Sequence, residues 1–157
     1  MKGMFIEDFE EGRIDVSPGR TVTETDVVTY SWVSGDVNPM HTDAEYAAKS
    51  PIGARIAHGT LGMSIATGLS AQIGGLIGTA IAAISVDEWT FLKPIFIGDT
   101  VTLHATVVSA RVSSSKPDRG ILIRRMDLKN QHGDTVQSGL MKTMVRSRAV
   151  YGNEKEQ

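Results

Sequence analysis

Hydrophobic and polar positions follow a helical period in the first half of the chain and an alternating period in the second. Between residues 59 and 72 apolar side chains recur every three or four residues, which predicts a long helix. Between residues 100 and 107 hydroxyl or His side chains alternate with aliphatic ones, as in a half-buried antiparallel strand. Helices that precede a run of strands predict an α+β fold in which a sheet packs on one apolar helix.

Three further segments of the second half also predict strands. They lie at about residues 80–92, 120–130 and 134–147. Gln131, His132 and Gly133 predict a hairpin turn between the last two of these strands. The connected strands therefore predict an antiparallel sheet, to which the opening stretch before Arg20 adds only a weak strand pattern.

Two pairs of residues in the first half have the spacing of a capping box, which marks the start of a helix. The pairs are Thr23 with Asp26 and Thr42 with Glu45. The first pair predicts a helix over about residues 24–34, and the second predicts a short helix that stops before Pro51. Between them, the turn-forming residues 35–39 predict an ordered loop.

Composition and charge exclude several classes of protein. The chain has 157 residues, of which 41% are apolar and 22% charged, so we expect one globular domain over residues 1–150 and a polar tail over 151–157. Lys and Arg number 16 against 18 Asp and Glu, and this balance leaves no basic surplus for a nucleic acid partner. The absence of Cys excludes disulfides, thiolate nucleophiles and Cys-based metal sites.

Two segments bear on export and membranes. The first residues carry acids where a secretory signal needs a long apolar run, so we expect a cytoplasmic protein. Residues 56–86 contain no Asp, Glu, Lys or Arg, but glycines and hydroxyl side chains interrupt every apolar run well before 18 residues. This segment therefore predicts a buried part of a globular protein, and we expect no membrane partner.

The candidate chemistry lies between the two halves of the chain. Glycine-rich nucleotide loops and the zinc helix motif are absent, so nicotinamide and nucleotide-hydrolysing chemistry have no support. Asp36 stands five residues before His41, and His58 opens the uncharged helix. This combination offers a carboxylate, an imidazole and a helix N-terminus. Two alternatives remain: each residue serves only a turn or a cap, or all three join Asp43 in a metal site.

The residues around this combination resemble a known family. Residues 30–43 read YSWVSGDVNPMHTD and residues 53–59 read GARIAHG, and these segments are similar to the hydratase motif of the MaoC-like dehydratases, the (R)-specific enoyl-CoA hydratase family. The similarity continues through FLKPIFIGD at 91–99 and NQHG at 130–133, so it covers about residues 5–148. The resemblance implies the hot-dog fold, a curled antiparallel sheet wrapped around a long central helix, and dimers whose sheets join edge to edge.

The resemblance also implies a set of catalytic residues. Asp36 and His41 would hold one water molecule and act on it as an acid–base pair, and the backbone N–H of Gly59 would polarise a thioester carbonyl. Hydration of a 2-enoyl thioester needs these groups, because water must lose a proton as it attacks C3, C2 must gain one, and charge develops on the thioester oxygen. A helix N-terminus offers such an N–H together with the positive end of the helix dipole.

Four further residues have supporting roles in this interpretation. Asn38 and Pro39 would shape the loop, with Asn38 forming a hydrogen bond across it to hold Asp36. His58 would either support the loop or cap the helix start. Thr67 stands where several hydratases of the family carry Ser, so the substrate-binding hydroxyl is kept and a methyl group is added.

The resemblance thus implies a lyase that reversibly hydrates a 2-enoyl thioester, linked to coenzyme A, to the (R)-3-hydroxyacyl product in fatty acid metabolism. It implies no metal and no organic cofactor, coenzyme A being part of the substrate, and a homodimer or higher homo-oligomer. Two alternatives share the fold: a thioesterase that uses a carboxylate and the same helix N-terminus, and a non-catalytic module that binds acyl thioesters. The spacing of Asp36 and His41 around Asn38 and Pro39 favours hydration.

Overall fold

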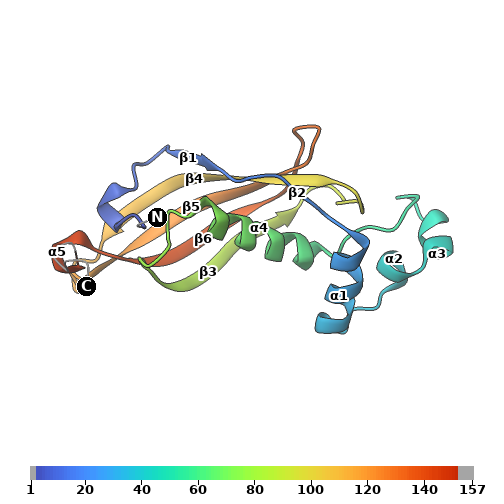
Figure 1. Cartoon of the computed structure of the whole chain (residues 1–157), viewed down its shortest axis with the longest axis horizontal. Helices are drawn as coiled ribbons and strands as arrows, with labels where there is room; N and C mark the ends of the chain where they lie inside the picture. Colours follow the sequence, from blue (N-terminus) through green and yellow to red (C-terminus); the bar gives the residue numbers. More distant parts are fainter. Residues whose placement is uncertain (1–2, 152–157) are drawn as a thin grey trace.

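The computed structural model describes residues 3–151 and has a curled antiparallel sheet with a long helix across one face (Figure 1). The strands are β1 (Ile14–Val16), β2 (Arg20–Thr21), β3 (Ala80–Phe91), β4 (Thr100–Val112), β5 (Arg119–Lys129) and β6 (Thr135–Arg146). The helices are η1 (Ile6–Asp8), α1 (Glu24–Ser34), α2 (Pro39–Thr42), α3 (Ala44–Ala48), α4 (Gly59–Ile73) and α5 (Arg148–Tyr151). The predicted α+β architecture and its order of elements are confirmed.

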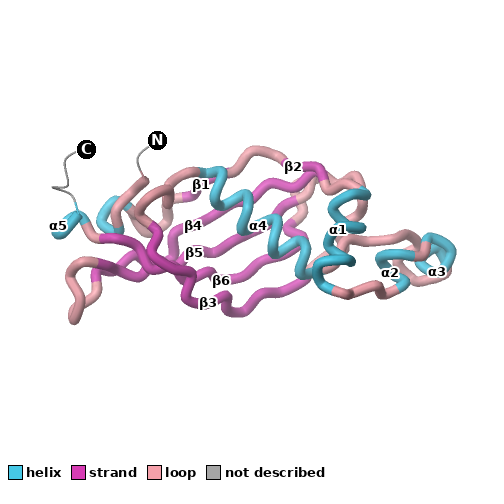
Figure 2. The backbone as a smooth tube through the Cα atoms, turned by 60° about the horizontal axis from the view of Figure 1, so that its bottom comes forward, coloured by secondary structure: helices cyan, strands magenta, loops and turns pink. Residues whose placement is uncertain are grey.

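The sheet has the order β1-β4-β5-β6-β3, with β2 paired to the start of β4. All of its pairings are antiparallel, and the predicted hairpin at residues 131–133 joins β5 to β6. Helix α4 lies across the sheet, and α1, α2 and α3 form a lobe beyond its N-terminal end (Figure 2). This arrangement brings the start of α4 next to the loop between α1 and α2. Of the predicted tail, all but Tyr151 lies outside the described residues.

Helix α4 carries the apolar stripe that its period predicts. Its side chains Leu61, Ile65 and Leu69 are buried and pack on the sheet. Their partners there include Val101, Leu103, Met126, Leu128 and Val136. The helix ends at Gly74, whose φ of 84° is the left-handed conformation that terminates helices. Over residues 3–151, no helix combines the length and the apolar character that crossing a membrane requires.

The first capping prediction is confirmed and the second is wrong in detail. The hydroxyl of Thr23 accepts a hydrogen bond from the Asp26 N–H at 3.2 Å, and the Asp26 carboxylate accepts one from the Thr23 N–H at 2.8 Å. The cap of α3 is Asp43, not Thr42, because its carboxylate accepts the Tyr46 N–H at 3.0 Å. Thr42 instead ends α2, a helical turn that begins inside the segment predicted as a loop.

One polar side chain links the start of α4 to the sheet. Gln137 faces the helix from β6 and is buried; its Nε2 donates to the carbonyl of Gly59 at 3.0 Å. The indole Nε1 of Trp89 donates to the Gln137 Oε1 at 3.1 Å, and the Trp89 ring packs against Gly139. Trp89 reaches this position because β3 bulges there, with Glu88 in a left-handed conformation at φ 53°. Both ends of the Gln137 amide are therefore held.

An ion pair ties the helical lobe to the segment that precedes α4. The two terminal nitrogens of Arg55 donate to the Glu24 carboxylate at 2.9 and 2.6 Å. One of them also donates to the carbonyl of His41 at 3.3 Å. These hydrogen bonds from Arg55 hold the pKa of Glu24 below its ordinary value. Arg55 thereby connects α1, α2 and the chain leading into α4.

The packing around α4 predicts opposite effects for two glycines of the same helix. We expect Gly62→Ala to destabilise the protein by roughly 1–3 kcal/mol, because the added Cβ would lie 2.2 Å from Gln137 Nε2, whose amide is held at both ends. Gly68→Ala is the matched control: its Cβ meets open space, so higher helix propensity stabilises by up to about 1 kcal/mol. Urea unfolding measures both, and equal effects would contradict this packing.

The Glu24–Arg55 pair predicts a dependence of stability on pH. A lowered pKa means that the pair contributes at neutral pH and loses its contribution as the pH falls through the Glu24 pKa, below 4.5. Since the Glu24 side chain is 53% exposed, we expect Glu24→Gln to cost at most about 1 kcal/mol. The difference in free energy of unfolding between Glu24→Gln and wild type becomes smaller as the pH falls through the Glu24 pKa. Glu11→Gln, at an exposed acid without an ion pair in the described part of the chain, serves as control in urea titrations at several pH values.

Candidate active site

The loop after α1 presents Asp36 through local hydrogen bonds. Gly35, with φ 74°, ends α1 and turns the chain away from the helix axis. The Asp36 carboxylate then accepts the N–H of Asn38 at 3.1 Å. The Asn38 side chain caps α2 by accepting the N–H of Met40 at 3.0 Å, and Pro39 occupies the first helical position. The expected contact between Asn38 and Asp36 is thus present, but it uses the Asn38 backbone and not its side chain.

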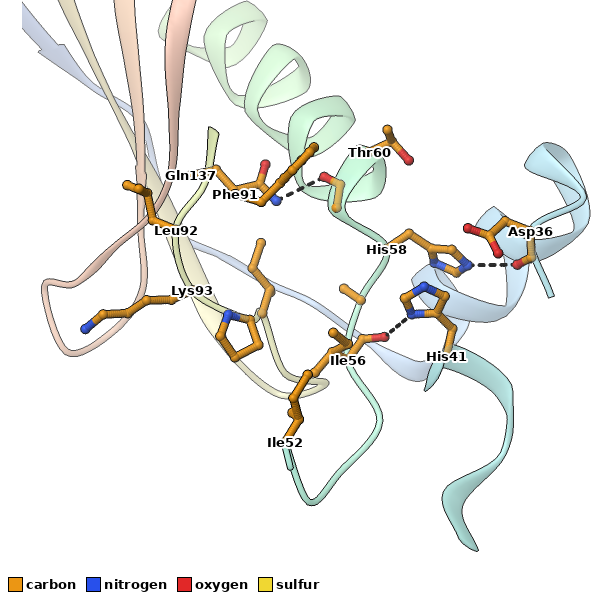
Figure 3. Close-up of a pocket in the computed structure, with 14 residues that line it drawn as sticks. Asp36, His41, Ile52, Ile56, His58, Thr60, Phe91, Leu92, Lys93 and Gln137 are labelled. Atoms are coloured by element: carbon orange, nitrogen blue, oxygen red, sulfur yellow. Dashed lines mark hydrogen bonds between the residues drawn. The ribbon is translucent and has the colours of Figure 1, made fainter. Parts of the chain in front are cut away.

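His41 lies on α2 with one ring nitrogen occupied. Its Nδ1 lies 2.8 Å from the carbonyl oxygen of Ile56, and a carbonyl can only accept, so Nδ1 carries the proton of the neutral ring. The remaining nitrogen, Nε2, then has a free lone pair. Figure 3 shows this nitrogen on the side of the ring that faces His58 and Asp36. The tautomer set by Ile56 therefore makes Nε2 of His41 the basic atom of the site.

His58 joins the loop to the start of α4. It is the N-cap residue of α4, but its side chain makes no capping hydrogen bond, so the helix-cap alternative is wrong. Its Nε2 instead donates to the backbone carbonyl of Asp36 at 2.9 Å (Figure 3). The same nitrogen lies 3.3 Å from the hydroxyl of Ser31. The ring is buried and stacks on His41, with 3.8 Å between ring centroids. His58 thereby supports both candidate catalytic residues.

The three side chains come together at one point. A carboxylate oxygen of Asp36 and one nitrogen from each of His41 and His58 all lie within 4.8 Å of one another. A water molecule makes hydrogen bonds of about 2.7–3.2 Å, so one water can reach the Asp36 carboxylate and the free His41 nitrogen together. Asp43, the fourth residue of the metal alternative, is not part of this group. The geometry suits a shared water and would also admit a divalent cation.

A cavity of about 470 Å³ opens beside these residues and reaches the first turn of α4. Asp36 and His41 line one side, and Phe91, Leu92 and Pro94 line the other. Gly59 lies on the cavity wall, and a Cβ there would lie 2.8 Å from the Phe91 ring, so a larger residue would displace this half-exposed ring into the cavity mouth or away from it. The first N–H that forms a hydrogen bond within α4 is that of Gly62, which donates to the carbonyl of His58. The Gly59 N–H comes before it and therefore has no partner within the helix.

The structure does not bring Thr67 to this cavity. Thr67 lies eight residues beyond Gly59 on α4, about 12 Å along the helix axis. Its hydroxyl donates to the carbonyl of Ser64 at 2.7 Å, and its side chain lines a separate cavity with Ser70 and Arg124. A substrate contact of Thr67 therefore stays a prediction, and it would be made in this separate cavity.

Three contributors to the site were missing from the sequence interpretation. They are the Ser31 hydroxyl, the Ile56 carbonyl and the Gln137 amide. Gln137 had a readable signal, because it is a polar residue on the inward face of an alternating strand. Ser31 and Ile56 had none, since each meets its His partner across a loop or between helices far apart in the chain.

Comparisons with known proteins identify the family of this chain. The family described as MaoC like domain matches residues 8–120. The (R)-specific enoyl-CoA hydratase of Rhodospirillum rubrum is 35% identical over 107 residues, which are 66% of this chain and 69% of that protein. Protein MaoC of Klebsiella aerogenes is 33% identical over 102 residues, 65% of this chain. The match spans only 30% of the length of protein MaoC.

Solved structures confirm the fold. A monoamine oxidase regulatory protein from Archaeoglobus fulgidus superposes with a TM-score of 0.85 at 34% identity, covering 92% of this chain and 95% of that one. A Mycobacterium tuberculosis protein with a double hotdog fold superposes with a TM-score of 0.80 at 22% identity, covering 92% of this chain and 44% of that one. The expected hot-dog fold is confirmed, and together with the family match these findings place the chain in the MaoC-like dehydratase family.

Proposed function

We propose that this protein is an (R)-specific hydro-lyase that reversibly adds water to a 2-enoyl thioester of coenzyme A. The observation that carries the proposal is the approach of an Asp36 carboxylate oxygen and a ring nitrogen of His41 to within 4.8 Å of each other, beside the start of α4. The Rhodospirillum rubrum relative, whose name is (R)-specific enoyl-CoA hydratase, supports both the reaction and its stereochemistry.

In this proposal the water proton passes through His41. Nε2 of His41 removes a proton as the water oxygen attacks C3, and the resulting imidazolium delivers a proton to C2 on the same face of the double bond. The C3–O and C2–H bonds form as the carbon–carbon π bond breaks, so atoms and charge balance. Positioned proton transfer of this kind contributes typically about 10²–10⁴-fold to a rate.

Asp36 orients the water and stabilises the imidazolium that forms transiently on His41. Its carboxylate accepts a hydrogen bond from the water, which fixes the lone pair that attacks C3. The hydrogen bond from His58 to the Asp36 carbonyl holds this residue against the start of α4, because it fixes the backbone that carries the carboxylate. The distance between the Asp36 carboxylate and the N-terminus of α4 thus stays nearly constant during the reaction.

The Gly59 N–H serves as the donor to the thioester oxygen. Negative charge develops on this oxygen as water attacks C3, and a helix N-terminus offers both an unpaired N–H and the positive end of a dipole. Removal of one such donor costs about 10²–10³ in rate in other enzymes. The hydrogen bond from Gln137 to the Gly59 carbonyl holds the first residue of the helix in place.

We further propose that two copies pair through β3. This strand is an edge of the sheet, and its aliphatic side chains Ile81, Ile84 and Val86 are each 40–47% exposed. An open edge with exposed aliphatic residues is a template for pairing with a second chain. Edge-to-edge pairing would continue the sheet across both copies, as the family resemblance implies.

The acid–base pair predicts the loss of activity in two variants. We expect Asp36→Asn and His41→Ala each to lower turnover of crotonyl-CoA by at least about 10²-fold, or roughly 3 kcal/mol at the barrier. Asp43→Asn is the matched control, because Asp43 lies outside the cluster and Asn caps a helix as well as Asp does. The measurement is the loss of the conjugated enoyl thioester absorbance.

A free-thiol assay run in parallel separates the alternatives. Loss of absorbance without thiol release identifies hydration, whereas thiol release identifies a thioesterase. Wild-type rates in folded Asp36→Asn and His41→Ala variants would remove the pair from the mechanism. Neither absorbance loss nor thiol release by the wild type, with a series of enoyl chain lengths, would identify a binding module.

We also propose that the reaction needs no metal. Water activation by a carboxylate and an imidazole requires no metal ion, although the one free nitrogen on each ring and the Asp36 carboxylate could also hold a cation. We expect hydration of crotonyl-CoA to continue at an unchanged rate after prolonged treatment with EDTA and removal of the chelator. Complete inhibition that a divalent cation reverses would establish the metal alternative.

A further inference from the structure

A second cavity, of about 330 Å³, lies at the far end of α4 from the proposed active site. Helix α4 contributes Thr67 and Ser70 to its wall, and the sheet contributes Arg124, Met141 and Thr143. Neither the acid–base pair nor the oxyanion donor makes use of this cavity. One of these lining residues, Arg124, carries a charge, and protein interiors rarely contain a charged side chain.

Arg124 breaks the alternation of β5. The strand directs Leu122, Met126 and Leu128 to one face of the sheet, and all three are buried, Met126 and Leu128 beneath α4 and Leu122 beneath η1. Arg124 occupies the same face between them and is only 2% exposed. The neighbouring Arg125 points to the other face and is exposed. A position that the pattern reserves for an aliphatic side chain therefore holds a guanidinium group.

The guanidinium has few partners in the described part of the chain. Its Nη2 donates to the Ser70 hydroxyl at 2.9 Å, and its Nε is buried without a hydrogen bond. No carboxylate of residues 3–151 lies within 4.0 Å of it. Asp15 acts on it only at longer range, and two nitrogens of Arg13 already bind the Asp15 carboxylate at 2.9–3.1 Å. Arg124 thus has no counter-ion among the described residues.

An uncompensated buried charge is expensive, and native proteins pair such groups or use them. Burial lowers the pKa of Arg124, because removal from water disfavours the charged guanidinium, and Asp15 offsets this only in part. Thr143 adds a second polar side chain to the cavity wall. The Arg124 Nε is itself closed to solvent, so a molecule in the cavity would contact the guanidinium through its terminal nitrogens.

We propose that this cavity binds a carboxylate on a short aliphatic chain, with Arg124 forming the ion pair. Guanidinium binds carboxylate through two parallel hydrogen bonds, and Ser70 orients it for this contact. The aliphatic part would lie against Leu76, Ile77 and Met141, which line the same cavity. The carboxylate has two possible sources: the far end of the acyl chain of the thioester substrate, or a free carboxylic acid.

The first source rests on the proposed function and on the position of the two cavities along one strand. Gln137 lines the first cavity and Met141 the second, so about 13 Å of β6 separates them. Trp89 packs on Gly139 between these positions. An acyl chain that reaches Arg124 from Gly59 must therefore pass beside the Trp89 ring, whereas a free acid need not.

Binding of a free acid tests the site without any turnover. Titration calorimetry with hexanoate and with hexanamide compares a carboxylate with its neutral counterpart. We expect wild type to bind hexanoate at least about tenfold more tightly than hexanamide, and Arg124→Met to lose this preference. Arg125→Met, on the other face of the same strand, is the matched control and keeps it. Arg124→Lys retains a charge without the fork and is expected to bind hexanoate more weakly than wild type.

Turnover measurements test whether the carboxylate is the far end of the acyl chain of the substrate. The ratio of kcat/KM for a 2-enoyl-CoA with a terminal carboxylate to that for its methyl-terminated counterpart should fall at least about tenfold in Arg124→Met. A change in this ratio alone assigns the site to the substrate, and a change in hexanoate binding alone assigns it to a free acid. Absence of both effects in wild type and in folded Arg124→Met and Arg124→Lys variants overturns the proposal. Hydration of crotonyl-CoA by wild type is measured separately, so the proposed function and this site can fail independently.

Discussion

The hydrogen bond from His58 to the backbone carbonyl of Asp36 is the interaction on which the site depends. It joins the residue just before α4 to the loop after α1, two segments that no continuous secondary structure connects. The helix is itself fixed by its apolar stripe against the sheet, so this bond transfers the rigidity of the core to an exposed loop. His41 stacks on the His58 ring, so His58 contacts both Asp36 and His41 and helps to fix their positions.

Much of the fold could be predicted from the sequence because its elements are strongly periodic. The stripe of α4 and the alternation of β4 each depend on burial of one face, which repeats along the segment. The turn-forming segment at 35–39 was harder, because Asn38 and Pro39 suit a loop and the start of a helix equally well. Only the contacts of His41 with the chain before α4 decide that a helical turn forms there.

The candidate site was predictable to the extent that its chemistry is local in the chain. Asp36 and His41 come from one bend, and the family resemblance supplied their roles. The groups that orient them lie far away in sequence, and no spacing rule connects Ile56 or Ser31 to its histidine. Arg124 could be noticed in the sequence, because it is a charged residue on the buried face of an alternating strand. Only the structure shows which groups surround the guanidinium, and so only the structure suggests a binding site there.

The chain of contacts from Trp89 through Gln137 to Gly59 has a consequence for assembly. Trp89 belongs to the open edge of the sheet, at a bulge where the backbone of Glu88 adopts an uncommon conformation. A second strand added at this edge would restrict the bulge, and the Trp89 indole connects the bulge through Gln137 to the carbonyl of Gly59. If two copies pair through β3 as proposed, the added strand would lie next to the residue that holds the Gln137 amide, and Gln137 in turn contacts the first residue of α4.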